Sequence, residues 1–102
     1  MSRLEQLEKL LSAEPGDVFL NFALAMEYLK MGRHAEALAQ FDRVNELDPN
    51  YVAAYFQKGN ALLALGRREE AKAVLTRGVE AAQRTGNTHA AGEMGDLLKA
   101  LG

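Results

Sequence analysis

The strongest constraint on this chain is an internal repeat, in which the pattern of residues 18–51 recurs in residues 52–85. The two segments align without a gap and share ten identities, where chance would give roughly two. The identical pairs are Val18 and Val52, Phe22 and Phe56, Leu29 and Leu63, Gly32 and Gly66, Arg33 and Arg67, Glu36 and Glu70, Ala37 and Ala71, Ala39 and Ala73, Arg43 and Arg77, and Glu46 and Glu80. A period of about 34 residues predicts stacked helical units that bury their apolar faces against one another.

The segments on either side of the two full copies continue the same period. Pro15 precedes Pro49 by one full period, so residues 1–17 correspond to the second half of an incomplete preceding copy. At the other end, residues 94–102 repeat residues 58–66 at an offset of 36 residues, two more than the period of 34. We therefore expect two extra residues in the turn before the last helix, at residues 85–88. We therefore expect a single domain over residues 1–102, divided into segments 1–17, 18–51, 52–85 and 86–102.

Each full copy is predicted to contain two helices joined by a glycine turn. Apolar residues recur at spacings of three and four on both sides of Gly32 and Gly66. Glycine ends a helix at low cost because it readily adopts the left-handed conformation. Ser2 and Glu5 form a capping-box pattern, and Asp17 can cap the following helix. The sequence predicts six helices and no strands, over residues 3–13, 18–31, 35–47, 52–65, 68–84 and 89–101.

The composition argues against several classes of function. The chain has 102 residues, with 12 Lys and Arg against 14 Asp and Glu, and it contains no cysteine. The absence of cysteine excludes disulfides, thiolate metal sites and a cysteine nucleophile. The chain also lacks the basic patch that nucleic-acid binding requires. No stretch approaches the roughly 20 apolar residues of a membrane span, so we expect a cytoplasmic protein that binds neither nucleic acid nor membrane.

No pattern in the sequence points to catalysis. His34 follows a turn glycine, where solvated polar residues are expected. His89 stands four residues before Glu93, a spacing that could hold a metal ion but that an ordinary helix surface explains equally well. Gly92 and Gly95 interrupt a predicted helix and form no phosphate-binding loop. We therefore expect a protein that is not an enzyme and that holds no metal or cofactor.

The repeat resembles the tetratricopeptide repeat family, whose helix pairs stack into a right-handed superhelix. The resemblance rests on Leu24, Tyr28, Gly32, Ala37, Phe41 and Pro49 in the first copy and on Tyr55, Gly59, Leu62, Gly66, Ala71 and Leu75 in the second. Two positions depart from the family pattern: Asn21 stands where Trp is frequent, and Gly78 stands where Ala is frequent. A glycine inside a helix lowers stability by up to about 1 kcal/mol relative to alanine. The resemblance implies an all-α solenoid of antiparallel helix pairs, in which Gly59, Gly95 and Ala25 allow close helix contacts.

The resemblance also implies a function, because the first helix of each pair in this family lines a concave groove that binds peptides or helices of partner proteins. The matching groove residues are Phe19, Phe22, Met26, Leu29, Phe56, Gln57, Asn60, Leu63, Glu93 and Asp96. Their apolar majority predicts an apolar or amphipathic partner. Glu93 and Asp96 would repel an acidic C-terminal tail, which a variant of the family binds. The alternative is that these apolar residues form the floor of a shallow groove that neighbouring helices half cover, and that they bind no partner.

A second hypothesis places function at the two ends of the stack. The first helix lacks the helix that would precede it in a pair, and the last helix lacks the one that would follow. The residues assigned to these self-association ends are Leu7, Leu10, Met94, Leu98 and Leu101. We expect Leu7 and Leu10, and some of Met94, Leu97, Leu98 and Leu101, to lack full cover. Pairing of the last helix with the first helix of another molecule would complete a repeat and give rings or filaments, whereas contact between like ends would give a dimer. The alternative is that the terminal helices simply cap the stack.

Overall fold

The computed structural model describes residues 1–102 and consists of six helices. They are α1 (Arg3–Ala13), α2 (Val18–Lys30), α3 (His34–Leu47), α4 (Val52–Ala64), α5 (Arg68–Arg84) and α6 (Thr88–Leu101). The six predicted helices and the all-α class are confirmed, with helix ends that differ by no more than one residue. None of these helices has the length and apolar character that crossing a membrane requires.

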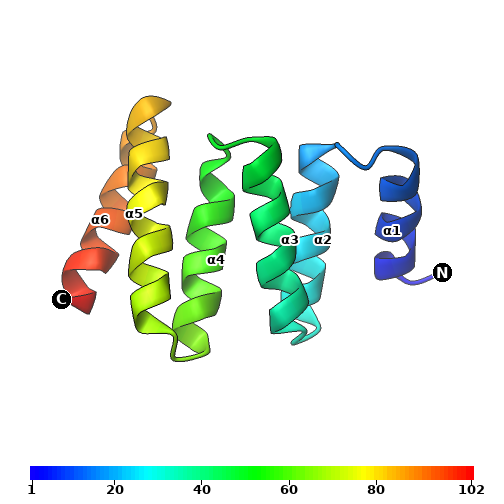
Figure 1. The fold of residues 1–102 in the computed structure, drawn as a ribbon, viewed down its shortest axis with the longest axis horizontal. Coiled ribbons are helices and arrows are strands. Elements are labelled where there is room, and N and C mark those ends of the chain that lie inside the picture. Colours follow the sequence, from blue (N-terminus) through cyan, green and yellow to red (C-terminus); the bar gives the residue numbers. More distant parts are fainter. The chain divides into compact units, whose positions relative to one another are not determined.

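The chain divides into two compact units, Met1–Asp48 and Pro49–Gly102, here called the N-terminal and C-terminal units. In the N-terminal unit α2 packs against α1 and, as an antiparallel pair, against α3 (Figure 1). In the C-terminal unit α5 packs against α4 in the same way and also against α6. Each unit therefore contains one complete helix pair and one additional helix.

Three helices end at a left-handed glycine with one hydrogen-bond pattern. The glycines are Gly32, Gly66 and Gly86, with φ of 75°, 75° and 72°. At the end of α2, the amide of Arg33 donates to the carbonyl of Tyr28 at 2.9 Å, and the amide of Gly32 donates to that of Leu29 at 3.0 Å. This is the Schellman arrangement, which satisfies carbonyls that a helix end leaves without partners. The predicted turns at Gly32 and Gly66 are confirmed.

Side chains cap the starts of α1, α2 and α6. Ser2 Oγ accepts a hydrogen bond from the amide of Glu5 at 3.1 Å, and Glu5 Oε1 accepts one from the amide of Ser2 at 3.3 Å, which confirms the capping box. Asp17 Oδ1 accepts from an amide of α2 at 2.9 Å and confirms the second predicted cap. Asn87 caps α6 in the same way at 3.1 Å. The sequence prediction did not include this third cap.

The core of the N-terminal unit covers a residue that the sequence led us to expect at an open end. Leu7 of α1 is only 4% exposed because it packs against Ala23 and Leu24 of α2. The expectation that Leu7 lacks cover is therefore wrong. Leu10, one helical turn further along α1, is 53% exposed, so the predicted lack of cover holds for that residue.

Asn21 occupies the position where the resemblance leads one to expect tryptophan, and it is a buried polar residue, 3% exposed. Its Nδ2 donates hydrogen bonds to the carbonyls of Pro15 at 3.1 Å and Asp17 at 2.7 Å. Its Oδ1 accepts a hydrogen bond from Gln40 of α3. A buried amide is stable only when its polar atoms are paired, and here the pairing ties the start of α2 to the preceding turn and to α3.

Two glycines allow close helix contacts in the C-terminal unit. A β-carbon at Gly59 would lie 2.6 Å from Leu75 Cδ2, which confirms the predicted role of Gly59. A β-carbon at Gly78 would lie 2.6 Å from Met94 Sδ and 2.9 Å from Tyr55 Cβ. Gly78 is therefore more than a weak helix former, because a side chain in its place would collide with both α4 and α6.

Two expectations about α6 are wrong. Met94 was assigned to a self-association end, but it is 0% exposed and packs against Leu75 and Ala82. Gly95 was expected to sit at a close helix contact, but nothing lies within 4 Å of the position of its β-carbon. Adjacent helical residues point about 100° apart, so the face that turns Met94 toward α5 leaves Gly95 open. Leu98 and Leu101 are partly buried against the same cluster.

Candidate functional site

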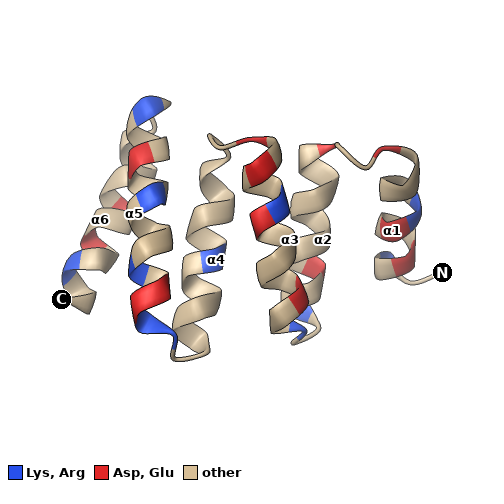
Figure 2. Ribbon diagram, in the orientation of Figure 1, with Lys and Arg blue, Asp and Glu red and all other residues tan.

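The first helix of each pair carries few charges. The charged residues of α2 are Glu27 and Lys30, and α4 contains only Lys58. Most of α4 is accordingly tan in Figure 2. The second helices, α3 and α5, carry charged residues of both signs along their length. Because charged groups are costly to remove from water, α2 and α4 are better suited to an apolar partner than α3 and α5.

The N-terminal hollow is an open cavity of about 410 Å³ lined by α1 and α2. Its lining residues are Arg3, Phe19, Phe22, Ala23, Met26, Glu27 and Lys30. Phe19 is 67% exposed, whereas Phe22 and Met26 are half-buried. The ring of Phe22 lies 5.9 Å from the ring of Phe41, centroid to centroid, so the floor rests on the core of the unit.

The rim of the N-terminal hollow contains an ion pair between two helices. Arg3 Nε of α1 lies 3.5 Å from Glu27 Oε2 of α2. The side chain of Glu27 is 12% exposed and that of Arg3 is 61% exposed. The carboxylate is therefore held in the wall, while the guanidinium remains largely in solvent and is the more easily displaced partner.

The C-terminal hollow is an open cavity of about 300 Å³ lined by α4 and the start of α6. Its lining residues are Val52, Ala53, Phe56, Gln57, Asn87 and Ala90. Phe56 packs against the buried cluster of Leu75, Ala82 and Met94, so this floor also rests on a core. The rim is polar but uncharged, since Gln57 and Asn87 supply amides.

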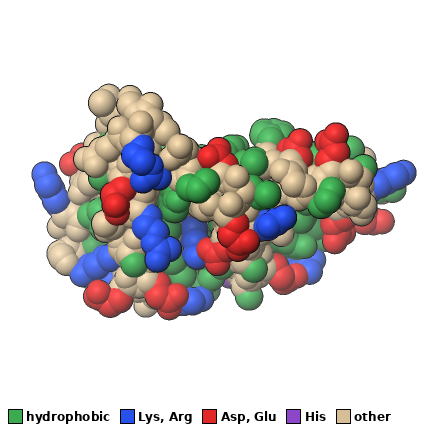
Figure 3. Space-filling view, turned by 45° about the horizontal axis from the view of Figure 1, so that its top comes forward, with side chains coloured by type: hydrophobic (Ala, Val, Ile, Leu, Met, Phe, Trp, Pro, Cys, Tyr) green, Lys and Arg blue, Asp and Glu red, His purple; other side chains and the backbone are tan.

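The two hollows occupy equivalent places in the repeat. Their floors, Phe22 and Phe56, are one repeat apart and are among the ten identities between the copies. Each floor thus combines a packing contact beneath the ring with an apolar face open above it. In the space-filling view, hydrophobic side chains lie among charged side chains of both signs on the face displayed (Figure 3).

Half of the predicted groove residues line these hollows. Phe19, Phe22 and Met26 lie in the N-terminal hollow, and Phe56 and Gln57 lie in the C-terminal hollow. The remaining predicted residues line neither hollow, and their role stays a prediction: Leu29, Asn60, Leu63, Glu93 and Asp96.

The sequence prediction omitted several lining residues that a helical spacing could have found. Ala23 and Glu27 follow Phe19 at spacings of four and eight, and therefore share its face of α2. No spacing in the sequence could have indicated Arg3, because this residue belongs to α1 and lines the hollow only as a result of the packing of α1 on α2.

Several charged groups form ion pairs on the surface outside the hollows. His89 Nε2 lies 2.7 Å from Glu93 Oε1 in an exposed pair on α6, and no group of three or more His, Cys, Asp or Glu could hold a metal ion. Arg67 donates to both carboxylate oxygens of Glu70 at 2.9 and 2.6 Å. These hydrogen bonds hold the pKa of Glu70 below its ordinary value and raise that of Arg67.

Known proteins similar to this chain share its repeat. Residues 28–92 match the tetratricopeptide repeat family. A TPR repeat-containing protein of Pseudomonas aeruginosa is 32% identical over 98 residues, which cover 96% of this chain and 93% of that protein. The "Suppressor of RPS4-RLD 1" of Arabidopsis thaliana is 37% identical over 73 residues, or 71% of this chain. This chain spans only 7% of the length of that plant protein.

Solved structures show the same fold. A tetratricopeptide repeat domain protein from Salinibacter ruber superposes with a TM-score of 0.80 at 33% identity, over 85% of this chain and 88% of that chain. The first TPR of Spaghetti (RPAP3), bound to an HSP90 peptide, superposes with a TM-score of 0.76 at 28% identity, over 96% of this chain and 76% of that chain. The chain therefore belongs to the tetratricopeptide repeat family, whose members are protein-interaction modules and are typically not enzymes.

Proposed function

We propose that this chain binds apolar or amphipathic segments of a partner protein, whose side chains insert into the hollow of each unit. The observation that carries the proposal is the pair of equivalent phenylalanines, Phe22 and Phe56, each at the floor of an open apolar hollow. The likeness to a TPR that binds an HSP90 peptide supports a peptide as the kind of partner.

The hollows suit aliphatic or aromatic side chains. Full burial of one Leu, Ile or Phe side chain stabilises a complex by roughly 1.5–3 kcal/mol, before the cost of ordering the segment is subtracted. Each hollow can take at least one such side chain. A helix can present large apolar side chains to a hollow when these residues share one face, which makes an amphipathic segment the expected partner.

The residue types at the predicted groove argue against recognition of an acidic C-terminal tail. A tail carboxylate is bound most strongly by Lys or Arg directed into a groove. In this chain the positions that match the carboxylate-binding places of the family hold other residue types: Phe22, Met26, Gln57, His89 and Glu93. At the N-terminal hollow, a cation of the partner can replace Arg3 beside the carboxylate of Glu27.

A displayed library of random peptides, each long enough to form several helical turns, tests the proposal. We expect selected binders to carry two or more large apolar residues at helical spacing and to need no acidic C-terminus. The acidic HSP90 peptide SRMEEVD, bound by the RPAP3 repeat, should bind weakly in the same assay. Phe19→Ala and Phe56→Ala should each weaken the selected binders at least tenfold, measured by fluorescence anisotropy. Phe19 is chosen for the N-terminal hollow because its 67% exposure limits the effect on folding.

Two apolar residues outside the hollows provide matched controls. Met31 and Leu65 are 48% and 41% exposed and line neither hollow. Met31→Ala and Leu65→Ala should leave the affinity within about twofold of the wild type. The proposal is wrong if no peptide is enriched, or if the control and hollow variants lose binding equally while all remain helical by circular dichroism.

A further inference from the structure

The start of α4 differs from the starts of the other helices that line the hollows. Helices α1, α2 and α6 each begin with a side chain that accepts a hydrogen bond from an amide of the first turn. Helix α4 begins at Tyr51 without such a bond. Val52 and Ala53 of its first turn nevertheless line the C-terminal hollow, together with Phe56. An uncapped first turn opens more easily, so this part of the hollow needs another contact to hold it.

Tyr55 supplies that contact. Its hydroxyl donates a hydrogen bond to the carbonyl of Pro49 at 2.8 Å, which connects the fourth residue of α4 to the turn before the helix. A contact of this span fixes the angle at which the chain enters a helix, as a hydrophobic staple does. Val52 and Ala53 lie inside the closed segment, and Phe56 follows Tyr55 directly. The bond therefore holds the wall and the floor of the C-terminal hollow.

The first copy of the repeat makes the same connection with a different side chain. Asn21 and Pro15 precede Tyr55 and Pro49 by 34 residues, and Asn21 Nδ2 donates to the carbonyl of Pro15 at 3.1 Å. A short amide and a long phenol thus reach equivalent carbonyls from equivalent positions. In the first copy Asp17 also caps the helix, so two contacts hold its start. In the second copy the hydroxyl of Tyr55 acts without a cap.

The surroundings of Tyr55 allow its hydroxyl to be removed without other loss. Arg84, the last residue of α5, donates to the carbonyl of Pro49 at 3.3 Å and through Nε to Asn50 Oδ1 at 3.1 Å. These bonds hold the turn on α5 independently of Tyr55. Phenylalanine in place of Tyr55 would retain the ring and the contact of Cβ with Gly78. Loss of the hydroxyl should therefore release only the start of α4.

We propose that Tyr55 is a positioning residue of the C-terminal hollow, which holds the first turns of α4 in the arrangement that accepts a side chain of the partner. The inference rests on the proposed function, because this hollow must bind a segment for its shape to affect affinity. Tyr55 itself does not line the hollow, so its effect is indirect. A partner binds only molecules in which the start of α4 is closed, and its apparent affinity falls with their fraction.

Tyr55→Phe tests the inference with peptides selected from the displayed library. Peptides that Phe56→Ala weakens report on the C-terminal hollow, and peptides that Phe19→Ala weakens report on the N-terminal hollow. By fluorescence anisotropy, Tyr55→Phe should weaken the first group about threefold to tenfold, as the net strength of one neutral hydrogen bond permits, and leave the second within about twofold. Unchanged affinity of the first group overturns the inference.

A cap introduced at the start of α4 provides a rescue. Residue 51 corresponds to Asp17, so Tyr51→Asp supplies the side chain that caps α2 in the first copy. Tyr51→Asp alone is the reference, which cancels the loss of other contacts of Tyr51. In that background Tyr55→Phe should weaken the same peptides less than about twofold, because the cap then holds the first turn. An equal loss in both backgrounds overturns the inference.

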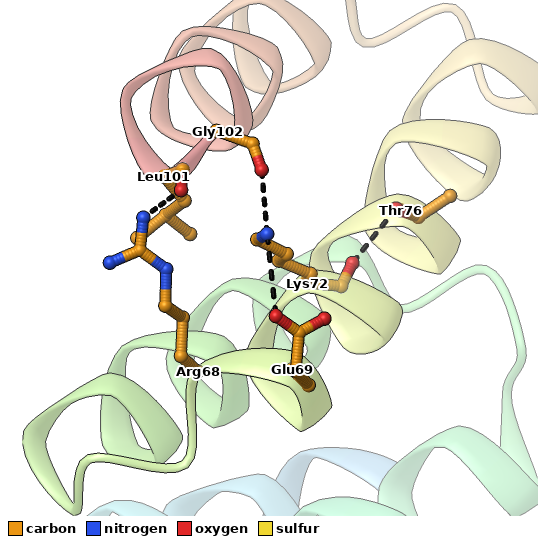
Figure 4. Close-up of polar contacts among 6 residues, drawn as sticks. All are labelled: Arg68, Glu69, Lys72, Thr76, Leu101 and Gly102. Carbon is orange, nitrogen blue, oxygen red and sulfur yellow. Dashed lines mark hydrogen bonds and ion pairs between the residues drawn. The ribbon is translucent and has the colours of Figure 1, made fainter.

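Hydrogen bonds of the same kind at the opposite end of α6 provide a control for lost stability. Arg68 and Lys72 of α5 donate to the carbonyl oxygens of Leu101 and Gly102, the second at 2.6 Å (Figure 4). Neither basic residue lines a hollow. Lys72→Met should therefore lower the free energy of unfolding but leave peptide affinity within about twofold. A loss as large as that of Tyr55→Phe would indicate general destabilisation and overturn the inference.

Amide hydrogen exchange of the free protein separates this inference from the proposed function. The amides of residues 55–57 have their helical acceptors in the segment 51–53, so Tyr55→Phe should speed their exchange with no peptide present. Wild-type protein that binds no peptide would refute the proposed function, and faster exchange would then still support the hold of Tyr55 on α4. Unchanged exchange overturns the inference whether or not peptides bind.

Discussion

Gly78 and Gly95 show how the surroundings of a residue can reverse the effect of its intrinsic propensity. Both lie inside helices, where glycine is less favourable than alanine by roughly 0.5–1 kcal/mol. Gly78 lies in a contact with Tyr55 and Met94 that leaves no room for a side chain, whereas Gly95 has open space around it. One glycine is therefore required by packing and the other only weakens its helix.

Alanine substitution at these two positions should have opposite effects on stability. Gly78→Ala should lower the free energy of unfolding by about 1–3 kcal/mol, because its β-carbon would force Met94 and the backbone of α4 to shift. Gly95→Ala should raise it by roughly 0.5–1 kcal/mol, because it gains helix propensity without a collision. Urea denaturation measures both. A stabilising Gly78→Ala would show that the contact between α5 and its neighbours is looser than the structure indicates.

At the scale of the element, the second helix of each pair begins with the same ion pair. Arg33 donates to Glu36 at the start of α3, and Arg67 donates to Glu70 at the start of α5. Both pairs are solvent-exposed, so each contributes little to stability at physiological salt. Both carboxylates lie in the first turn of their helix, where a negative charge interacts favourably with the helix dipole.

Stability should depend on the ionisation of Glu70 in a defined direction. The hydrogen bonds from Arg67 lower the pKa of Glu70 in the folded protein, so its contribution is present above the ordinary glutamate pKa. That contribution is lost as the pH falls through the lowered pKa. The difference in unfolding free energy between wild type and Glu70→Gln should therefore shrink between about pH 5 and pH 3 at low salt. Glu80→Gln, which removes a charge elsewhere on α5, is the control. A difference for Glu70→Gln that is unchanged across this range would contradict the assignment.

At the scale of the whole molecule, packing differs between the helices of each unit. In the N-terminal unit α2 packs against both α1 and α3, and in the C-terminal unit α5 packs against both α4 and α6. The additional helices, α1 and α6, each pack against one neighbour in their unit. Stability in repeat proteins comes largely from such neighbour contacts, so it is not uniform along the chain.

Amide hydrogen exchange should reflect this arrangement. We expect the slowest exchange in α2 and α5 and faster exchange in α1 and α6, because opening a terminal helix disrupts fewer contacts. Gly92 and Gly95 should add to the opening of α6, although Arg68 and Lys72 oppose it at the C-terminal end. Protection in α6 equal to that in α5 would show that the C-terminal unit opens only as a whole.

The sequence was sufficient to predict the helices and their turns, because local interactions determine them. The turn glycines and the caps at Ser2 and Asp17 each act within a few residues of chain, and the repeat period shows where they recur. The phenylalanine floors were also predictable, since Phe22 and Phe56 repeat at equivalent positions. Arg3 of the N-terminal hollow was not, because only the packing of α1 on α2 brings it there.

The sequence by itself thus determined the repeat, the six helices and the family, since these depend on spacing along the chain. Only the tertiary structure decided which apolar residues are covered. Leu7 and Met94 are buried while Leu10 is exposed, although all three were assigned to the self-association ends. Only the tertiary structure also distinguished the close contact at Gly78 from the open site at Gly95. The physical reason is that burial depends on how each helix is rotated against its neighbours, and that rotation is set by packing between residues distant in sequence.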